Sequence, residues 1–317
     1  MLASDPASTS RSHGNSHCMY LEYYGLARKP FSLTPDPEFM FLSKQHAIAL
    51  AMLKYGLQNQ AGFTLITGEV GSGKTTLIRH LLRTLEANLT IGVITNTHRN
   101  YGDLLTWILS AYGLDLGDRD NVTMHRRLLE FVAAEHKAGR RVVLVVDEAQ
   151  NMDVQMLEEL RLLSNMNVGD ELLLQLVLVG QPELQQTIAL PELLQFAQRI
   201  SAEHHITPLD YESTEKYIRH RAAVAGCQEE LFDRYARAAV YYYSRGIPRA
   251  INNICDMALV YGYAEEVKPV SCELIMEVIR SRPIIRRQAE ATPRDDTDRR
   301  LRDLVLEIKG IDLADVS

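Results

Sequence analysis

The chain has 317 residues and a formal net charge of −7, with 34 Lys and Arg against 41 Asp and Glu. This acidic balance argues against a protein that its overall charge holds on DNA or on an anionic membrane. The 46% of hydrophobic and 24% of charged residues are ordinary values for a globular protein and exclude a disordered or fibrous chain.

Three further patterns bear on where the protein works. No apolar run reaches about 18 residues, the length that a membrane-spanning helix needs. The N-terminus lacks the charged and then apolar stretches of a secretory signal. The four cysteines lie far apart, with no CxxC pair and no histidine at ligand spacing, which argues against a zinc site or a disulfide framework. They are Cys18, Cys227, Cys255 and Cys272. These patterns predict a cytoplasmic protein.

The N-terminal part of the chain changes character at Met19. Residues 1–18 are rich in Ser, His, Gly and Asn and nearly free of large apolar residues, so we expect a disordered leader. From Met19 the sequence is aromatic and punctuated by proline (MYLEYYGLARKPFSLTPDPEFMFLS), which predicts an extended strap packed on a domain. Residues 47–57 then show helical apolar spacing.

The following stretch alternates short β-rich runs with longer helical ones. We expect strands at 62–67, 91–95, 141–147, 172–180 and 204–206. Between them we expect helices at 74–85, 101–112, 124–137 and 154–164. Apolar strands that are buried on both faces and separated by helices indicate a doubly wound α/β domain, with a mainly parallel sheet and helices on both faces. With its strap, this predicted core covers residues 19–207.

After Pro208 the strand signals stop. Helical spacing recurs at 211–225, 229–244, 248–264 and 271–281, which predicts a small all-helical lid domain over residues 208–282. Residues 283–317 mix arginines with acidic residues. We expect a solvated polar tail there, with one short helix at 300–309.

One motif carries the chemistry. The sequence from Gly68 to Thr75 fits G-x-x-x-x-G-K-[ST], and it follows an apolar strand and precedes an amphipathic helix, as a phosphate-binding loop requires. Its backbone N–H groups and the helix N-terminus would hold phosphate oxygens. The alternative is a glycine-rich turn with a chance Lys-Thr. The expected nucleotide-binding residues are Gly68, Glu69, Val70, Gly71, Ser72, Gly73, Lys74, Thr75 and Thr76, with Lys74 between the β- and γ-phosphates and Thr75 on Mg²⁺.

A second element supports this prediction. The apolar strand at 141–147 ends in Asp147 and Glu148. At that strand tip Asp147 would reach the Mg²⁺ shell, and Glu148 would orient and deprotonate the attacking water. The alternative is an acidic cap for the helix that starts near Asp153. A catalytic glutamate favours hydrolysis over phosphoryl transfer to a small molecule.

Three weaker signals follow. Gln181 ends the strand at 172–180 and would act as a phosphate or water sensor if that strand neighbours the other two; otherwise it is a turn residue. Arg199 precedes the last strand, and we interpret it as a finger that completes a neighbouring subunit's site, with a surface salt bridge as the alternative. Arg249, in Gly246-Ile-Pro-Arg, begins a lid helix and would point back to the phosphates, because Pro248 fixes the helix start.

Five ordered blocks resemble those of one known group. They are the opening MYLEYYGLARKPFSLTPDPEFMFLS, GEVGSGKTT, VVDEAQNM with LEELRLLSN, LVGQPEL, and GIPRAIN. This set is similar to the ExeA/GspA-type AAA+ ATPases. Within them it is most similar to the exosortase (PEP-CTERM)-associated secretion ATPases. The resemblance covers roughly residues 19–281.

The resemblance implies a P-loop NTPase of the AAA+-like kind with a helical lid, the use of ATP and Mg²⁺, and a role in secretion or envelope assembly. It places Walker A at residues 68–76, Walker B at Asp147 and Glu148, and the sensor-2 GxPR at 246–249. ExeA-like proteins carry a membrane span and a periplasmic peptidoglycan-binding domain after the ATPase. Because only the polar residues 283–317 follow here, we do not expect direct cell-wall binding.

Three functions compete. The first is an oligomerising ATPase, cytoplasmic or peripheral to the inner membrane, that works with protein partners of a secretion or exopolysaccharide system. The second is a DNA-bound transposition regulator of the TniB kind. The net charge and the lack of a basic winged-helix-like module argue against it, while the basic stretch 280–287 keeps it open. The third is a GTPase or small-molecule kinase, against which the lack of an NKxD motif and the presence of Glu148 both argue.

Overall fold

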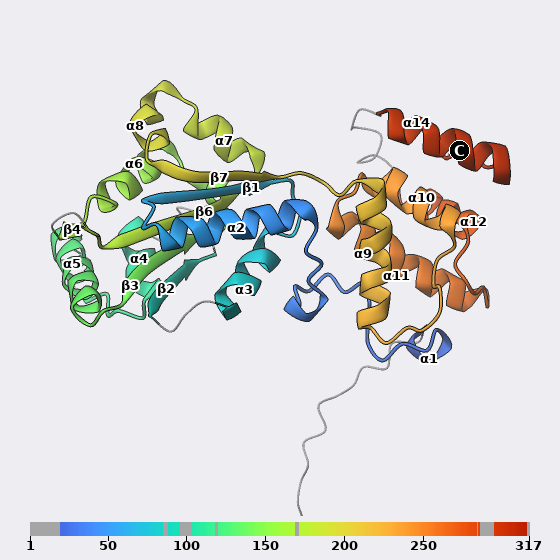
Figure 1. The fold of residues 1–317 in the computed structure, drawn as a ribbon, viewed down its shortest axis with the longest axis horizontal. Helices are drawn as coiled ribbons and strands as arrows, with labels where there is room; N and C mark the ends of the chain where they lie inside the picture. Colours follow the sequence, from blue (N-terminus) through green and yellow to red (C-terminus); the bar gives the residue numbers. More distant parts are fainter. Residues whose placement is uncertain are drawn as a thin grey trace, which may run out of the picture.

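The computed structural model describes residues 20–84, 88–95, 103–117, 120–168, 171–283, 285 and 295–315. The predicted leader, residues 1–18, lies outside these ranges. Figure 1 shows an α/β body and a helical body side by side, joined by the connection between β7 and α9. The predicted fold class, a P-loop NTPase sheet with helices on both faces followed by helices alone, is confirmed.

The short helices of the strap and then the elements of the α/β body come first in the chain, in this order. They are α1 (Tyr20–Tyr23), η1 (Pro37–Phe39), α2 (Lys44–Gln58), β1 (Phe63–Gly68), α3 (Lys74–Thr84), β2 (Leu89–Ile94), α4 (Leu104–Ala111), α5 (Asn121–Lys137), β3 (Arg141–Val146), η3 (Ala149–Asn151), α6 (Val154–Leu163), β4 (Asn167–Val168), β5 (Glu171–Leu172), β6 (Leu174–Gly180), α7 (Pro182–Ile188), η4 (Pro191–Leu193), α8 (Leu194–Ala197) and β7 (Ile200–Ile206). The helical body then holds α9 (Tyr211–Val224), α10 (Arg234–Ser244), α11 (Pro248–Ala264), α12 (Cys272–Arg280) and α14 (Asp296–Lys309).

The main sheet has the strand order β2-β3-β6-β1-β7, and every pairing in it is parallel. Strand β6 therefore lies between β1, which precedes the glycine-rich loop, and β3, which precedes Asp147. Because parallel strands end at the same edge of a sheet, the residues that follow β1, β3 and β6 meet there.

Both faces of the sheet are buried, as the apolar runs predicted. Leu65, Leu144 and Leu176 pack against helices α4 to α8 on one face. On the other face, Val145 and Val177 pack with α2 and α3. The alternation follows from the two-residue repeat of a strand, so each apolar run serves two cores at once.

Two strand predictions needed correction. The strand predicted at 172–180 is divided: β5 pairs with β4 in an antiparallel hairpin, and β6 starts at Leu174. The last strand, predicted at 204–206, is longer and begins at Ile200. It is an edge strand with exposed residues such as Ser201 and Glu203, so it lacks the continuous apolar run that marks the inner strands.

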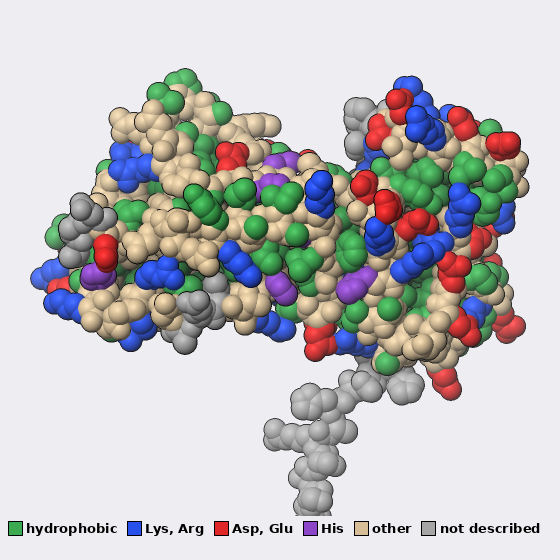
Figure 2. Space-filling model, viewed as in Figure 1, with side chains coloured by type: hydrophobic (Ala, Val, Ile, Leu, Met, Phe, Trp, Pro, Cys, Tyr) green, Lys and Arg blue, Asp and Glu red, His purple; other side chains and the backbone are tan. Residues whose placement is uncertain are grey.

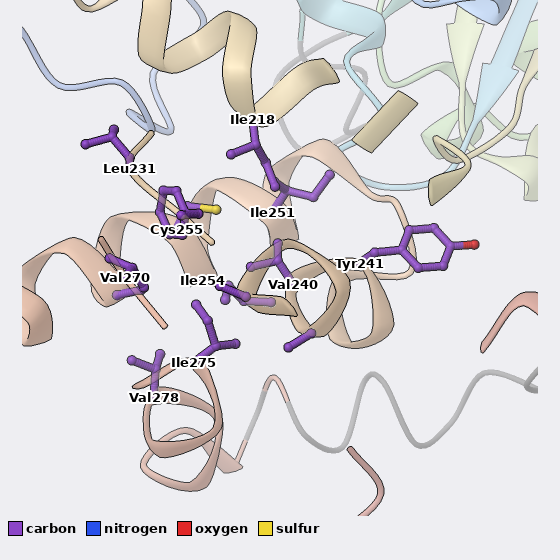
Figure 3. Close-up of a cluster of buried hydrophobic side chains, with 14 of the residues drawn as sticks. Ile218, Leu231, Val240, Tyr241, Ile251, Ile254, Cys255, Val270, Ile275 and Val278 are labelled. Carbon is purple, nitrogen blue, oxygen red and sulfur yellow. The ribbon is translucent and has the colours of Figure 1, made fainter. Parts of the chain in front are cut away.

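The helical body has its own apolar core, part of which Figure 3 shows with Ile218 of α9, Val240 of α10, Ile254 of α11 and Ile275 of α12. The strap also belongs to this core: Tyr20, Tyr24, Phe31 and Phe39 are buried in it. In Figure 1 the first helix accordingly lies beside the C-terminal helices. The sequence predicts the strap as part of the α/β core, so this packing differs from that expectation.

Two expectations for the C-terminal helices were wrong in part. Helix α10 begins at Arg234, not near residue 229, because the Asp233 side chain caps it by accepting a hydrogen bond from the Ala236 N–H. The predicted polar tail does form a helix, α14, but this helix begins at Asp296 rather than at residue 300, and one side of it is not solvated. Its residues Leu301 and Val305 are buried in the core of the helical body. No helix within the described ranges is both long enough and apolar enough to cross a membrane.

Candidate functional site

The loop between β1 and α3 has the backbone of a phosphate cradle. Gly71 has φ +79° and Gly73 has φ +98°, conformations that favour glycine. A Cβ at position 71 would lie 2.5 Å from Arg249 Cβ, and one at position 73 would lie 3.0 Å from His46 Nε2. The loop is therefore closely packed by two other elements, and it leads directly into the N-terminus of α3, where anions are favoured.

Lys74 lies inside this loop. Its Nζ donates hydrogen bonds to the carbonyl oxygens of Gly68, at 2.6 Å, and Glu69, at 2.9 Å. The side chain is 6% exposed. Burial lowers the pKa of Lys74, whereas Glu148 and Asp147 raise it. The ammonium group is thus held by two neutral acceptors, which the charged oxygens of a phosphate would replace.

Thr75 and Asp147 form the oxygen pair that a Mg²⁺ site requires. The Thr75 hydroxyl donates to Asp147 Oδ2 at 2.7 Å. Burial raises the pKa of Asp147, and the hydrogen bond from Thr75 opposes this effect. A hydroxyl and one carboxylate fit Mg²⁺, which prefers oxygen ligands and usually takes one or two carboxylates together with substrate phosphates.

Glu148 has a constrained backbone and a fixed carboxylate. Its φ of 55° and ψ of 37° place it in the left-handed region, an uncommon position for a non-glycine residue. Its Oε2 accepts hydrogen bonds from Gln150 Nε2, at 2.6 Å, and Gln181 Nε2, at 3.2 Å. The side chain faces the same cavity as Lys74 and Thr75.

Gln181 and Gln150 connect two strand ends. Because β6 pairs with both β1 and β3, the condition placed on Gln181 is met, and its amide reaches Glu148. The Gln181 N–H also donates to Gln150 Oε1 at 3.1 Å. Sequence analysis did not identify Gln150. Its contact with position 181 depends on strand order, which no local pattern reveals.

Arg249 meets the phosphate loop from the helical body. Its backbone N–H donates to the Gly71 carbonyl at 3.2 Å, and its Cβ packs against Gly71. Pro248 occupies the first turn of α11, as predicted. A cavity of about 410 Å³ opens here between the two bodies, lined by Lys74, Thr75, Glu148, Gln181 and Arg249. Ligand pockets commonly measure about 300–1,000 Å³.

Comparison with known proteins agrees with this arrangement. Residues 57–188, which span β1 to α7, match the family model described as an AAA domain. The chain carries an AAA domain. Over 247 residues, 78% of its length, it is 43% identical to General secretion pathway protein A of Aeromonas hydrophila. The resemblance to the ExeA/GspA-type AAA+ ATPases is thereby confirmed. The chain spans about half the length of this relative, since the match covers 45% of it.

Solved structures share the fold at low sequence identity. A chain of the structure of Drosophila ORC bound to DNA has a TM-score of 0.62 at 17% identity, covering 98% of this chain and 84% of that one. The Aeropyrum pernix ORC2 protein, in its ADPNP-ADP complexes, has a TM-score of 0.59 at 15% identity, covering 90% and 85%. At such identities the likeness extends to the fold alone.

Sequence analysis also missed a histidine that contacts the AAA domain's phosphate loop. His46, 4% exposed at the start of α2, has its Nε2 at 2.9 Å from the Ser72 carbonyl oxygen and its Nδ1 at 2.7 Å from Ser43 Oγ. Because a carbonyl only accepts, Nε2 carries the proton and Nδ1 accepts from the Ser43 hydroxyl. Burial lowers the pKa of His46, which keeps the ring neutral.

A buried arginine fixes the strap to the helical body. Arg221 donates to the carbonyl oxygens of Pro30 and Ser32, and its guanidinium lies 4.7 Å from the centre of the Phe39 ring. Together with Tyr217 it also lines the cavity. This residue had no signal in the sequence, because its partners lie about 190 positions away.

Arg199 is the one predicted site residue outside this assembly. Strands β1 and β7 run parallel. Phe63 pairs with Ile200 where both strands begin, and Gly68 pairs with Ile206 where both strands end. Arg199 precedes Ile200 and lies beside Gly62, so six residue steps at roughly 3.3 Å each separate it from Gly68 of its own phosphate loop. Its guanidinium donates to Ser164 Oγ, at 2.7 Å, and to Asn165 Oδ1.

Proposed function

We propose that this chain hydrolyses ATP with Mg²⁺ and thereby drives the assembly or remodelling of a secretion, envelope or exopolysaccharide machinery. The observation that supports hydrolysis best is the convergence of Lys74, the Thr75–Asp147 pair and Glu148 on one cavity. Lys74 and Thr75 follow β1, whereas Asp147 and Glu148 follow β3, so the sheet topology brings the two pairs together.

The proposal gives each group one task. The loop amides and Lys74 hold the β- and γ-phosphates, and Thr75 with Asp147 provides the protein's ligands for Mg²⁺, which neutralises phosphate charge when bound. Glu148 accepts the proton of the attacking water. Gln150 and Gln181 donate to the same carboxylate oxygen and so fix its direction. Arg249 adds a positive charge from the helical body, whose residues 208–282 act as the lid.

The proposed machinery rests on the relative. That protein is called General secretion pathway protein A, and the similarity spans most of this chain. We therefore place the work of this chain beside proteins of a secretion pathway. The exopolysaccharide system and the location in the cytoplasm or at the inner membrane are proposed from the sequence resemblance alone. On the face drawn in Figure 2, basic and acidic side chains are interspersed over the helical body, which gives DNA no continuous basic surface on that face.

Self-assembly belongs to the same proposal. Arg199 lies where strands β1 and β7 begin, whereas the phosphate loop lies where β1 ends. Arg199 can therefore act only on a nucleotide that is bound to another copy of the chain. A nucleotide-dependent homo-oligomer in which each Arg199 reaches its neighbour's site accounts for this position. An arginine supplied in this way stabilises the charge of the transition state.

The proposal is tested by measuring phosphate release from ATP and from GTP, with Mg²⁺ and with EDTA. We expect turnover with ATP and Mg²⁺, little with GTP, and none with EDTA. Release at the level of a buffer blank under all conditions would contradict it. Stimulation by DNA that declines with salt would instead favour the transposition-regulator function.

A further inference from the structure

The C-terminal segment packs next to the loop that carries Arg249. Helix α14 lies along α10 in Figure 1 and buries Leu301 and Val305 against it. Leu313, just after the helix, is buried in the same core, where its carbonyl accepts a hydrogen bond from the Tyr243 hydroxyl. The segment 295–315 is therefore a fixed part of the helical body.

One ion pair joins this segment to the end of α10. Arg245 Nη1 donates to Asp298 Oδ2, and the two side chains are 15% and 1% exposed. The same Oδ2 accepts the Asp295 N–H at 3.0 Å in the capping box of α14. A pair this deeply buried holds its partners firmly, because separating them would leave a charge without compensation.

Arg245 is also the first residue of a short, rigid loop. It has φ 56°, and its N–H donates to the Tyr241 carbonyl to close α10. Gly246 follows with φ +70°, and its carbonyl accepts from the Leu209 N–H at 3.0 Å. A Cβ at position 246 would lie 1.9 Å from the Leu209 carbonyl oxygen, so the loop has no room to shift there.

The far end of this loop is the phosphate site. Pro248 starts α11, and the next residue, Arg249, bonds to the Gly71 carbonyl. Only three residues separate Arg245 from Arg249. A displacement of Arg245 therefore has to be taken up within this constrained loop, next to the contact between Arg249 and Gly71.

We propose that Asp298 is a positioning residue for Arg249: through Arg245 it sets where the Arg249 guanidinium meets the nucleotide phosphates. Docking of the segment 295–315 then tunes how the site distinguishes ATP from ADP. This inference rests on the proposed nucleotide chemistry. Its mechanical step, from Asp298 to the loop 245–249, can be tested without any nucleotide.

The first experiment compares two substitutions in the same segment. Asp298→Asn removes the charge that pairs with Arg245 and keeps an oxygen for the capping box. Asp312→Asn is the matched control, since it removes a two-bond ion pair with Arg302 at the other end of the segment. Without nucleotide, amide hydrogen exchange over residues 245–249 should quicken in Asp298→Asn and not in Asp312→Asn. Equal exchange in both variants and the unchanged protein would overturn the proposal.

The second experiment measures the affinity for ATP relative to ADP. Asp298→Asn should lower this ratio on the order of five- to tenfold, the scale of a typical coupling between two sites. In the Arg249→Ala background the same substitution should have no further effect, because the residue it positions is gone. A merely structural role would give effects that add, and additive effects would count against the proposal.

Two safeguards keep the outcomes distinct. If Asp298→Asn does not fold, Arg245→Gln tests the same link from the other side and should give the same faster exchange and lower ratio; unchanged values would overturn the proposal. If the unchanged protein binds no nucleotide, the proposed function and the tuning of the site both fail. The exchange measurement still decides whether Asp298 holds the loop.

Discussion

The Thr75 hydroxyl donates a hydrogen bond to the Asp147 carboxylate at 2.7 Å, although the two residues are 72 positions apart in the chain. Thr75 follows β1 and Asp147 follows β3, with β6 between these strands. The sheet thus brings the phosphate loop and the carboxylate to the distance at which one Mg²⁺ can share them.

This pair predicts how the metal affects binding. Asp147→Asn keeps an acceptor for Thr75 but lacks the negative charge that Mg²⁺ needs. ATP affinity measured by titration calorimetry in EDTA should therefore change little, while the gain in affinity on adding Mg²⁺ should be largely lost. Thr75→Ser, which keeps the hydroxyl, is the control and should retain the gain. An undiminished response to Mg²⁺ in Asp147→Asn would exclude this carboxylate as a ligand.

Lys74→Ala should abolish tight nucleotide binding. Two carbonyl oxygens of the loop hold the ammonium group. Among the described residues that line the cavity, no other positively charged side chain belongs to the phosphate loop. Lys54→Ala, on the exposed side of α2, removes the same charge elsewhere and should bind normally. Equal affinity of both variants for a fluorescent ATP analogue would show that the loop does not hold phosphate.

His46 should matter through its hydrogen bond to the loop. His46→Ala leaves the Ser72 carbonyl without its donor, so ATP and ADP should both bind about 5- to 15-fold more weakly, the scale of one lost hydrogen bond of about 1–1.5 kcal/mol. His46→Gln places an amide donor at the same reach and should recover most of the affinity. Failure of Gln to bind better than Ala would mean that the ring acts by filling space.

The same histidine predicts a pH dependence. Burial lowers the pKa of His46, so the unfolded chain binds a proton before the folded one does. As pH falls below about 6.5, the ordinary histidine value, the free energy of unfolding should therefore decrease until the folded pKa is reached. Denaturant titrations between pH 7.5 and 5 should show a smaller decrease for His46→Gln. The same decrease in both proteins would exclude this contribution.

Arg199 predicts a dependence on protein concentration. If it completes a neighbour's site, turnover per subunit should rise with concentration, and Arg199→Ala should remove that rise while leaving ATP binding nearly intact. The loss in turnover is expected at roughly 10³-fold or more. Arg126→Ala, an exposed arginine of α5, should behave like the unchanged protein.

Mixing two inactive variants sharpens this test. Arg199→Ala and Glu148→Gln proteins together form some interfaces that hold an intact Glu148 and an intact Arg199. Activity should then partly return. No recovery on mixing, or turnover that is independent of concentration in the unchanged protein, would leave Arg199 as a residue that only bonds to Ser164 and Asn165.

The sequence predicted best those elements whose pattern lies within one continuous segment. The phosphate loop and the inner strands could be predicted, because glycine spacing and apolar runs such as residues 141–146 are local properties. The edge strand β7 was underestimated, since one of its sides is unpaired and carries polar residues. The packing of α14 was missed because only two buried apolar side chains, Leu301 and Val305, distinguish it from a solvated helix.

The site shows the same limit. Lys74, Thr75, Asp147 and Glu148 stand in motifs and were identified. His46, Gln150 and Arg221 act through partners that only the folded chain brings close, such as the Ser72 carbonyl 26 positions from His46. No spacing rule connects such pairs, so their roles follow from the three-dimensional arrangement alone.

The most direct test of hydrolysis is to measure ATP binding and phosphate release together in Glu148→Gln. The variant keeps the shape of the side chain and removes the base, so ATP should bind with nearly unchanged affinity while turnover falls about 10²-fold or more. Gln155→Glu, at a position on α6 outside the cavity, is a control for a Glu/Gln exchange and should keep both values. Binding and turnover that fall together, or turnover that persists in Glu148→Gln, would contradict the account of Glu148 as the group that activates water.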